Sequence, residues 1–196
     1  MPAVSPKPEF DNAAWVYVPT RLDAKTLFEF CLNIEILFRL NPYLNISQWR
    51  TAGDGAIVNW KNHSTETARS LSTRLTTETN EYEICVHYQT GIKQETYFIV
   101  EADDNGANLT ILDRYADNAN ELADDVDKSI HAWGEALNRF FRHYKYIRRV
   151  PFIDAIIRRF WVKLSPMARR ITYMLLVIAI VELVALMLLV FVLLLR

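Results

Sequence analysis

The chain has 196 residues and a formal net charge of −1, which fits one domain of about 140 residues and a separate C-terminal segment. The total hides an asymmetry, because residues 1–146 contain 14 Lys and Arg against 21 Asp and Glu, whereas residues 147–196 contain 8 against 2. The acidic main part argues against nucleic-acid binding, which needs a basic face. The two cysteines, Cys31 and Cys85, belong to no motif and are expected to be reduced core residues.

The N-terminal region predicts a loose lead-in, a strand and a pair of helices. Residues 1–12 contain three prolines and few apolar side chains, so we expect a flexible start. Residues 14–19 (AWVYVP) are typical of a short strand. Residues 23–40 carry apolar side chains at helical spacing behind a candidate N-cap, Asp23, and we expect a break near Asn33 into two short helices.

After Asn41-Pro42, which ends the helical region, the apolar spacing changes to two. This predicts strands at about 46–52, 56–63, 67–78, 81–90, 93–103 and 107–115. Turn residues such as Asn and Gly separate them, and the short connections imply consecutive antiparallel hairpins. The alternation leaves one apolar face of the sheet that needs a cover.

A long helix over about 120–147 is the predicted cover. Its apolar stripe consists of Val126, Ile130, Trp133, Leu137, Phe140, Tyr144 and Ile147. Acidic residues near its start and basic residues near its end suit the helix dipole. Gly134, in mid-helix, either lets the helix approach the sheet or leaves room for a ligand.

The segment 148–165 predicts a basic amphipathic helix lying in a membrane interface. Within it, residues 151–164 (PFIDAIIRRFWVKL) place apolar side chains on one side and basic ones on the other. The alternative is that this helix docks on the protein's own sheet. Side chains expected at the membrane surface, including two that follow this segment, are Arg148, Arg149, Arg158, Arg159, Trp161, Lys163, Arg169 and Arg170.

The segment 166–196 predicts a transmembrane anchor. Residues 171–195 are almost continuously apolar, which is long enough to cross a bilayer core of about 30 Å. Ser165-Pro166 is a typical helix start. A buried core helix is the alternative, and the length of the run disfavours it. The upstream basic residues predict a single-pass protein of the cell membrane with a cytoplasmic N-terminal domain, and no signal peptide is recognisable.

Glu182 is an ionisable residue near the middle of the expected span. Insertion of a charged group at that depth costs at least about 2.5–3.5 kcal/mol. It either remains protonated against lipid or faces another membrane helix, and we favour the second because polar side chains within spans usually face protein. This predicts self-association or docking on another membrane protein.

The order of one strand, two short helices, six antiparallel strands and a long helix resembles the START-like, or SRPBCC, superfamily. The resemblance covers residues 13–147 and rests on AWVYVPTRLDAKTLFEF, the break at Asn41-Pro42, the hairpin series and VDKSIHAWGEALNRFF. It implies an α+β helix-grip fold, in which a curved antiparallel sheet wraps the long helix around an apolar cavity. Members bind lipids, sterols, quinones, polyketides or hormones, and some are cyclases or aromatases. The branch of the carbon-monoxide-dehydrogenase G subunit is similar in also having a C-terminal membrane-seeking tail.

A sheet bent around one helix predicts an apolar ligand cavity with few polar groups. The candidate lining residues are Tyr82, Ile84, Val86, Tyr88, Phe98, Val100, Leu109, Ile111, Asp113, Trp133, Leu137 and Phe141. The alternative is that they form an ordinary core. Asp113 either points inward, to a ligand hydroxyl or to Arg74, or is solvated where the strand twists outward, which we favour slightly.

No catalytic or cofactor motif is recognisable in the sequence. His87 alternates with inward-facing residues and is expected to face outward, and no two histidines show metal-ligand spacing with a carboxylate or cysteine, so we predict no metal. No Gly-rich phosphate loop or nucleophile elbow is present, and we predict no cofactor.

Three functions are consistent with these features. The first is a membrane-anchored module that binds an apolar small molecule such as a lipid, quinone or isoprenoid at the cytoplasmic face. The second is an accessory or assembly subunit of a larger membrane enzyme, held through Glu182 and the basic helix. The third is a cyclase-type enzyme that uses Asp113 or Tyr88 as acid or base. We rank them in this order and expect binding rather than catalysis.

Overall fold

The computed structural model describes residues 12–64, 69–116, 123–147, 152 and 156–195. Seven strands form one antiparallel sheet of order β1-β7-β6-β5-β4-β3-β2. They are β1 (Ala13–Thr20), β2 (Leu44–Ala52), β3 (Gly55–Asn62), β4 (Arg69–Asn80), β5 (Glu83–Tyr88), β6 (Lys93–Asp103) and β7 (Gly106–Tyr115). All seven predicted strands are confirmed, with ends shifted by at most two residues. The first strand pairs with the last at one edge.

Two short helices, α1 (Ala24–Cys31) and α2 (Ile34–Leu40), follow β1. Each starts at a side chain that accepts a backbone N–H: Asp23 Oδ1 from Thr26 at 2.9 Å, and Asn33 Oδ1 from Ile36 at 3.2 Å. The predicted break at Asn33 is therefore confirmed, and its cause is a second N-cap within one apolar pattern.

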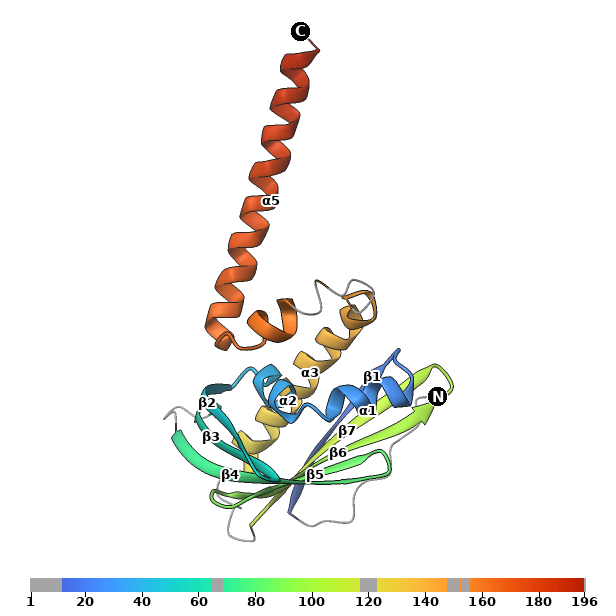
Figure 1. Cartoon of the computed structure of the whole chain (residues 1–196), viewed down its shortest axis with the longest axis vertical. Coiled ribbons are helices and arrows are strands. Elements are labelled where there is room, and N and C mark those ends of the chain that lie inside the picture. Colours follow the sequence, from blue (N-terminus) through green and yellow to red (C-terminus); the bar gives the residue numbers. More distant parts are fainter. Residues whose placement is uncertain (1–11, 65–68, 117–122, 148–151, 153–155, 196) are drawn as a thin grey trace.

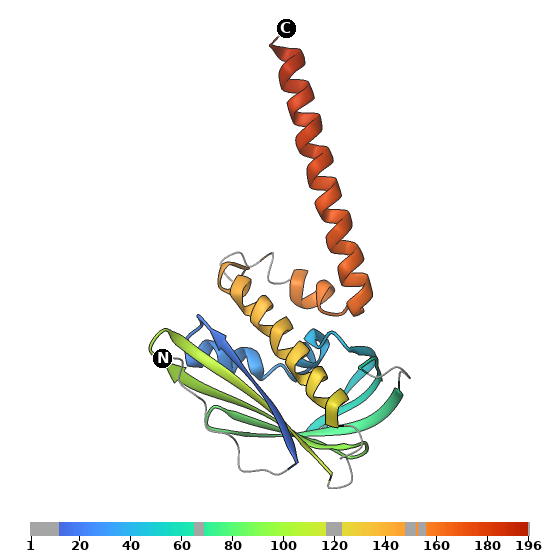
Figure 2. The ribbon, with the colours of Figure 1, turned by 180° about the vertical axis from the view of Figure 1, so that it is seen from behind.

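The long helix α3 (Ala123–Ile147) lies across the concave side of the sheet (Figures 1 and 2). The architecture is the expected α+β helix-grip fold. A Cβ on Gly134 would lie 2.4 Å from Val16 Cγ2 on β1. The glycine therefore permits close approach of α3 to the sheet, and this settles the choice between close approach and space for a ligand.

A short π-helical turn, η2 (Ile157–Trp161), connects the domain to α5 (Pro166–Leu194), which projects away from it (Figure 1). None of the residues of α5 is buried, so it is not a core helix. By length and composition it is able to cross a membrane. Ser165 caps its start by accepting the N–H of Ala168 at 3.2 Å.

The segment before α5 docks on the domain, which differs from the expected free interfacial helix. Val162 is only 1% exposed, and Ile157 packs against the core, whereas Phe152, Ile156 and Phe160 are exposed. The π-helical turn changes the helical phase, so residues expected on one apolar side lie on two. The segment therefore contacts the domain beside α2 and not on the sheet, and its location in a membrane interface stays a prediction.

Candidate functional site between the sheet and α3

The predicted lining residues converge between the sheet and α3. Most of them are buried in one continuous cluster: Ile84, Val86, Phe98, Val100, Leu109, Ile111, Trp133, Leu137 and Phe141. They pack closely, as the 5.6 Å separation of the Phe98 and Trp133 ring centroids shows. The sequence pattern therefore identified the inward-facing set.

Tyr82 does not belong to this set. Its backbone has a φ of 56° in the turn before β5, and 43% of the residue is exposed. Its ring packs edge-on against Phe28 of α1, with centroids 5.3 Å apart. The strict alternation that placed it inside fails because the left-handed turn conformation changes the direction of the side chain.

Asp113 is the buried polar centre of the site, at 0% exposure. Its Oδ2 accepts hydrogen bonds from Lys93 Nζ and, at 3.2 Å, from the Tyr115 hydroxyl, and its Oδ1 accepts one from Thr96 at 2.5 Å. The favoured expectation of a solvated Asp113 is wrong, and so is its pairing with Arg74, which instead contacts Asp54 at 3.5 Å. The carboxylate remains inside because three donors replace its water.

A hydrogen-bond relay extends from this carboxylate. The Tyr88 hydroxyl lies 2.7 Å from Thr96 Oγ1, and because Thr96 donates to Asp113, it accepts from Tyr88. Burial, followed by the charge of Asp113, raises the pKa of Tyr88 well above its usual value. Tyr88 therefore stays protonated and can donate a hydrogen bond at neutral pH.

Lys93 is the functional candidate that the sequence did not predict. It starts β6 beside a register shift between Lys93 and Glu95, and its side chain is 22% exposed. Its Nζ lies 5.8 Å from the ring centroids of both Tyr115 and Trp133. The irregular register breaks the alternation that would have placed Lys93, so only the folded sheet shows that this cation reaches Asp113.

A groove of about 720 Å³ lies beside this interior, between α1–α2 and strands β2–β4. Its wall combines apolar side chains with polar ones, and the members are Ile34, Trp49, Ala56 and Leu75 on the apolar side and Glu29, Asn33, Glu35, Thr51, Asp54 and Thr77 on the polar side. Trp49 contacts Phe38 with ring centroids 6.0 Å apart, and Phe38 contacts Tyr88 at 6.3 Å. A chain of aromatic rings therefore joins the groove to the Tyr88–Thr96–Asp113 relay, and Phe38 stands between them.

The expected membrane-surface residues occupy different environments. Arg159 and Lys163 are exposed and line a pocket of about 270 Å³ together with Glu35 and Arg39 of α2. Trp161 is half-buried and Arg170 is exposed. Arg148, Arg149 and the side chain of Arg158 lie outside the described residues.

Arg169 differs from the other expected surface residues because it turns toward the domain. Its Nη2 donates to the Arg39 carbonyl oxygen at 2.5 Å. Glu182, on the same helix, is exposed near the middle of α5.

The outer face of the sheet carries a cluster that the sequence reasoning missed. Cys85, His87 and Glu95 lie together there, although no metal-ligand spacing was recognised in the sequence. The two β5 residues are two apart and therefore share a face, but Glu95 joins them only through strand pairing. Cys85 is buried, yet it lies outside the core cluster in which it was expected.

Comparisons with known proteins find similar solved structures but no related sequence. No family model and no curated protein match the sequence. Similar solved structures include Zhui aromatase/cyclase from Streptomyces sp. R1128, with 8% identity over 74% of this chain and 94% of that chain and a TM-score of 0.47. A second is the di-domain ARO/CYC StfQ of the steffimycin biosynthetic pathway, with 7% identity over 69% of this chain and 52% of that chain and a TM-score of 0.49. A third is TTHA0849 from Thermus thermophilus, with 9% identity over 65% of this chain and 93% of that chain and a TM-score of 0.48. At these values, the named activities are not transferred to this chain.

Proposed function

We propose that this protein is a membrane-anchored module that binds an apolar small molecule carrying one oxygen acceptor, such as a quinone or lipid carbonyl. The observation that carries the proposal is the Lys93–Asp113 pair set into an aromatic interior. Lys93, partly exposed and held by Asp113, is the group placed to donate to the ligand oxygen. The aromatic rings and the neighbouring groove suit the apolar remainder.

Stability alone gives little reason for such a pair. Removing two charges from water costs several kcal/mol per ion, and an apolar pair of similar volume is often as stable or more so. A buried carboxylate that holds a partly exposed cation at the edge of an aromatic interior is more typical of a functional site. The three donors around Asp113 are all internal, which favours a fixed role in positioning Lys93 over a role as a free base. Binding is therefore favoured over cyclase-type catalysis.

The anchor gives this binding its location. We propose that α5 crosses the membrane and that the basic residues before it place the domain on the cytoplasmic side. A tethered domain meets membrane-dissolved ligands at a raised effective concentration. The resemblance to the carbon-monoxide-dehydrogenase G-subunit branch, which has a similar order of domain and tail, stays a prediction.

Quinone titration of the full chain in lipid nanodiscs tests the proposal. A short-chain quinone should quench tryptophan fluorescence saturably, since Trp133 and Trp49 adjoin the site. The double variant Lys93→Met/Asp113→Asn removes both charges together and should weaken binding roughly 10- to 100-fold, the equivalent of one charged hydrogen bond.

The matched control for this titration is Lys61→Met/Asp104→Asn, which removes an exposed cation and an exposed carboxylate that do not line the groove. It should leave the affinity unchanged. Quenching that does not saturate, or equal affinity of the two double variants, would contradict the proposed site.

A second candidate, an accessory subunit of a membrane complex, is favoured by Glu182, which is exposed in the middle of α5. A polar group in an apolar span gains most from a partner helix. We expect Glu182→Leu to abolish self-association or co-purification with a membrane partner, measured by native mass spectrometry of nanodiscs. Leu183→Ala, the neighbouring change, is the control. A monomeric wild type without a partner would leave only the binding function.

A further inference from the structure

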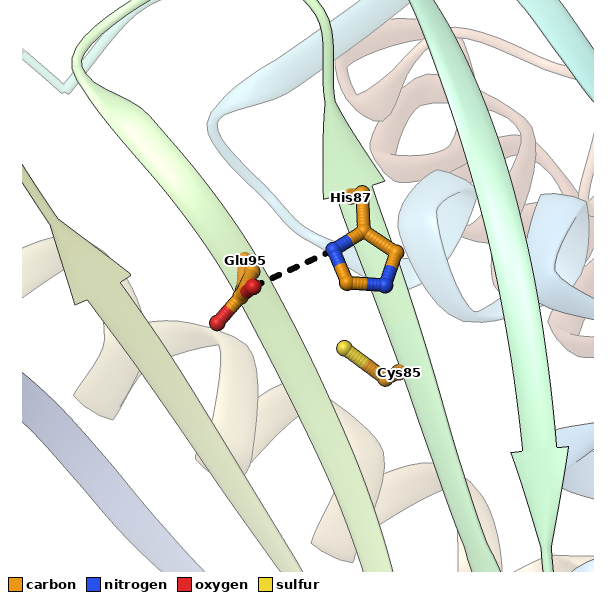
Figure 3. Close-up of side chains that lie close together, drawn as sticks. All are labelled: Cys85, His87 and Glu95. Atoms are coloured by element: carbon orange, nitrogen blue, oxygen red, sulfur yellow. Dashed lines mark ion pairs between the residues drawn. The ribbon is translucent and has the colours of Figure 1, made fainter.

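The outer face of β5 and β6 holds three side chains with metal-binding atoms. Cys85, His87 and Glu95 each offer one such atom, and these atoms all lie within 4.8 Å of one another (Figure 3). Cys85 and His87 project from one face of β5, and Glu95 is the cross-strand partner of His87. The cluster faces away from α3 and is separate from the Lys93–Asp113 site.

Glu95 is held in an orientation that presents one oxygen to the cluster. Its Oε1 lies 3.1 Å from His87 Nδ1, and the dashed line in Figure 3 marks this pair. Its other oxygen, Oε2, accepts from the Tyr97 hydroxyl at 2.8 Å and from Arg114 Nε at 3.1 Å. Metal-binding carboxylates are characteristically oriented by such outer hydrogen bonds.

His87 has one ring nitrogen that is available to a metal ion. Its Nε2 is buried and has no hydrogen-bond partner among the described residues. The nearest acidic oxygen, Oε1 of Glu78 on β4, is 3.6 Å away. A buried imidazole nitrogen without a partner is costly, and the cost is relieved if the ring turns to bind a metal ion.

We propose that Cys85, His87 and Glu95 bind one divalent transition-metal ion of the zinc class, with Glu78 or water as the fourth ligand. Sulfur, nitrogen and oxygen donors together select borderline ions over Mg²⁺ or Ca²⁺. Ligand atoms around tetrahedral zinc lie roughly 3.3–3.8 Å apart, so small side-chain rotations close the site. Binding replaces the Cys85 thiol proton with the metal, and the proton passes to solvent.

The local charge favours a cation at this position. Burial raises the pKa of Cys85 to about 11, its hydrogen-bonding contact with Tyr97 opposes this, and Glu95, Glu78 and Glu83 raise it further. The three carboxylates that disfavour a bare thiolate are the same groups that stabilise a dication beside it. The bound ion would join β5 to β6 and, through Glu78, to β4.

Cobalt titration of the full chain tests the site. The reduced, chelator-treated protein in detergent micelles should bind one Co²⁺ with a thiolate-to-metal charge-transfer band and tetrahedral visible bands, both displaced by Zn²⁺. Cys85→Ser should abolish the charge-transfer band. His87→Gln and Glu95→Gln should each weaken binding at least tenfold.

Two exposed residues, His143 and Glu101, supply matched controls: His143→Gln and Glu101→Gln should bind as the wild type does. Circular dichroism of each metal-free variant checks its folding. At equal metal concentration, the metal should also raise the unfolding temperature of the wild type and of the two controls, and raise that of His87→Gln less. Absence of the band in the folded wild type, or an unchanged band in Cys85→Ser, would overturn the proposal.

Discussion

Two polar clusters occupy opposite faces of the same strands. On the inner face, Asp113 is fully buried, and both of its oxygens accept from internal donors. On the outer face, Glu95 and His87 are partly exposed, and His87 Nε2 lacks a partner among the described residues. Neighbouring strands of one sheet therefore carry a network in which both carboxylate oxygens are hydrogen-bonded and another in which a ring nitrogen is not. We expect the more deeply buried network to contribute more to stability.

The largest expected effect comes from breaking the inner pair. Asp113→Leu leaves the Lys93 charge unpaired near an apolar interior and should lower the free energy of unfolding by about 3–5 kcal/mol. Glu95→Leu, its outer-face counterpart, should cost less, about 1–2 kcal/mol, because its partners His87 and Arg114 keep access to water. Urea unfolding of the full chain in micelles, followed by tryptophan fluorescence, measures both. Equal losses would show that burial does not separate the two clusters.

A smaller loss of stability should follow from forcing α3 away from β1. Gly134→Ala places a methyl group against Val16 and should cost about 1–3 kcal/mol, as overpacking does. Val16→Ala in the same chain should restore part of this loss by making room. A double-mutant cycle measured by urea unfolding checks the coupling, and additive losses would place the two residues out of contact.

The Cys31 thiol, on the inner side, tests the effect of burial on stability at alkaline pH. Burial raises the pKa of Cys31, on the inner side, to about 12, whereas an unfolded thiol ionises near about 8.5. Above about pH 8.5 the unfolded chain has lost a proton that the folded chain keeps. The free energy of unfolding should therefore fall by about 1.4 kcal/mol per pH unit until the pH reaches the pKa of Cys31 in the folded protein. Cys31→Ala should reduce the measured slope. An unchanged slope between about pH 9 and 11 would contradict the effect of burial.

The sequence predicted the fold well because its apolar periods are clear. The strands and the inward-facing set beginning at Ile84 are confirmed, since strand alternation depends only on local geometry. The polar partners were not predictable in the same way. Lys93 reaches Asp113 through an irregular register, and Glu95 meets His87 through pairing between strands. Such contacts depend on the exact alignment of distant residues, which periodicity does not encode.

The junction between the domain and α5 has a mechanical consequence. Val162 is anchored in the domain, Ser165 caps α5 three residues later, and Arg169 is bonded to the carbonyl of Arg39. Because so few residues separate these contacts from α5, rotation of α5 about its own axis turns the domain with it. If two such helices paired inside a bilayer, the choice of helix face would also fix which sides of the two domains confront each other.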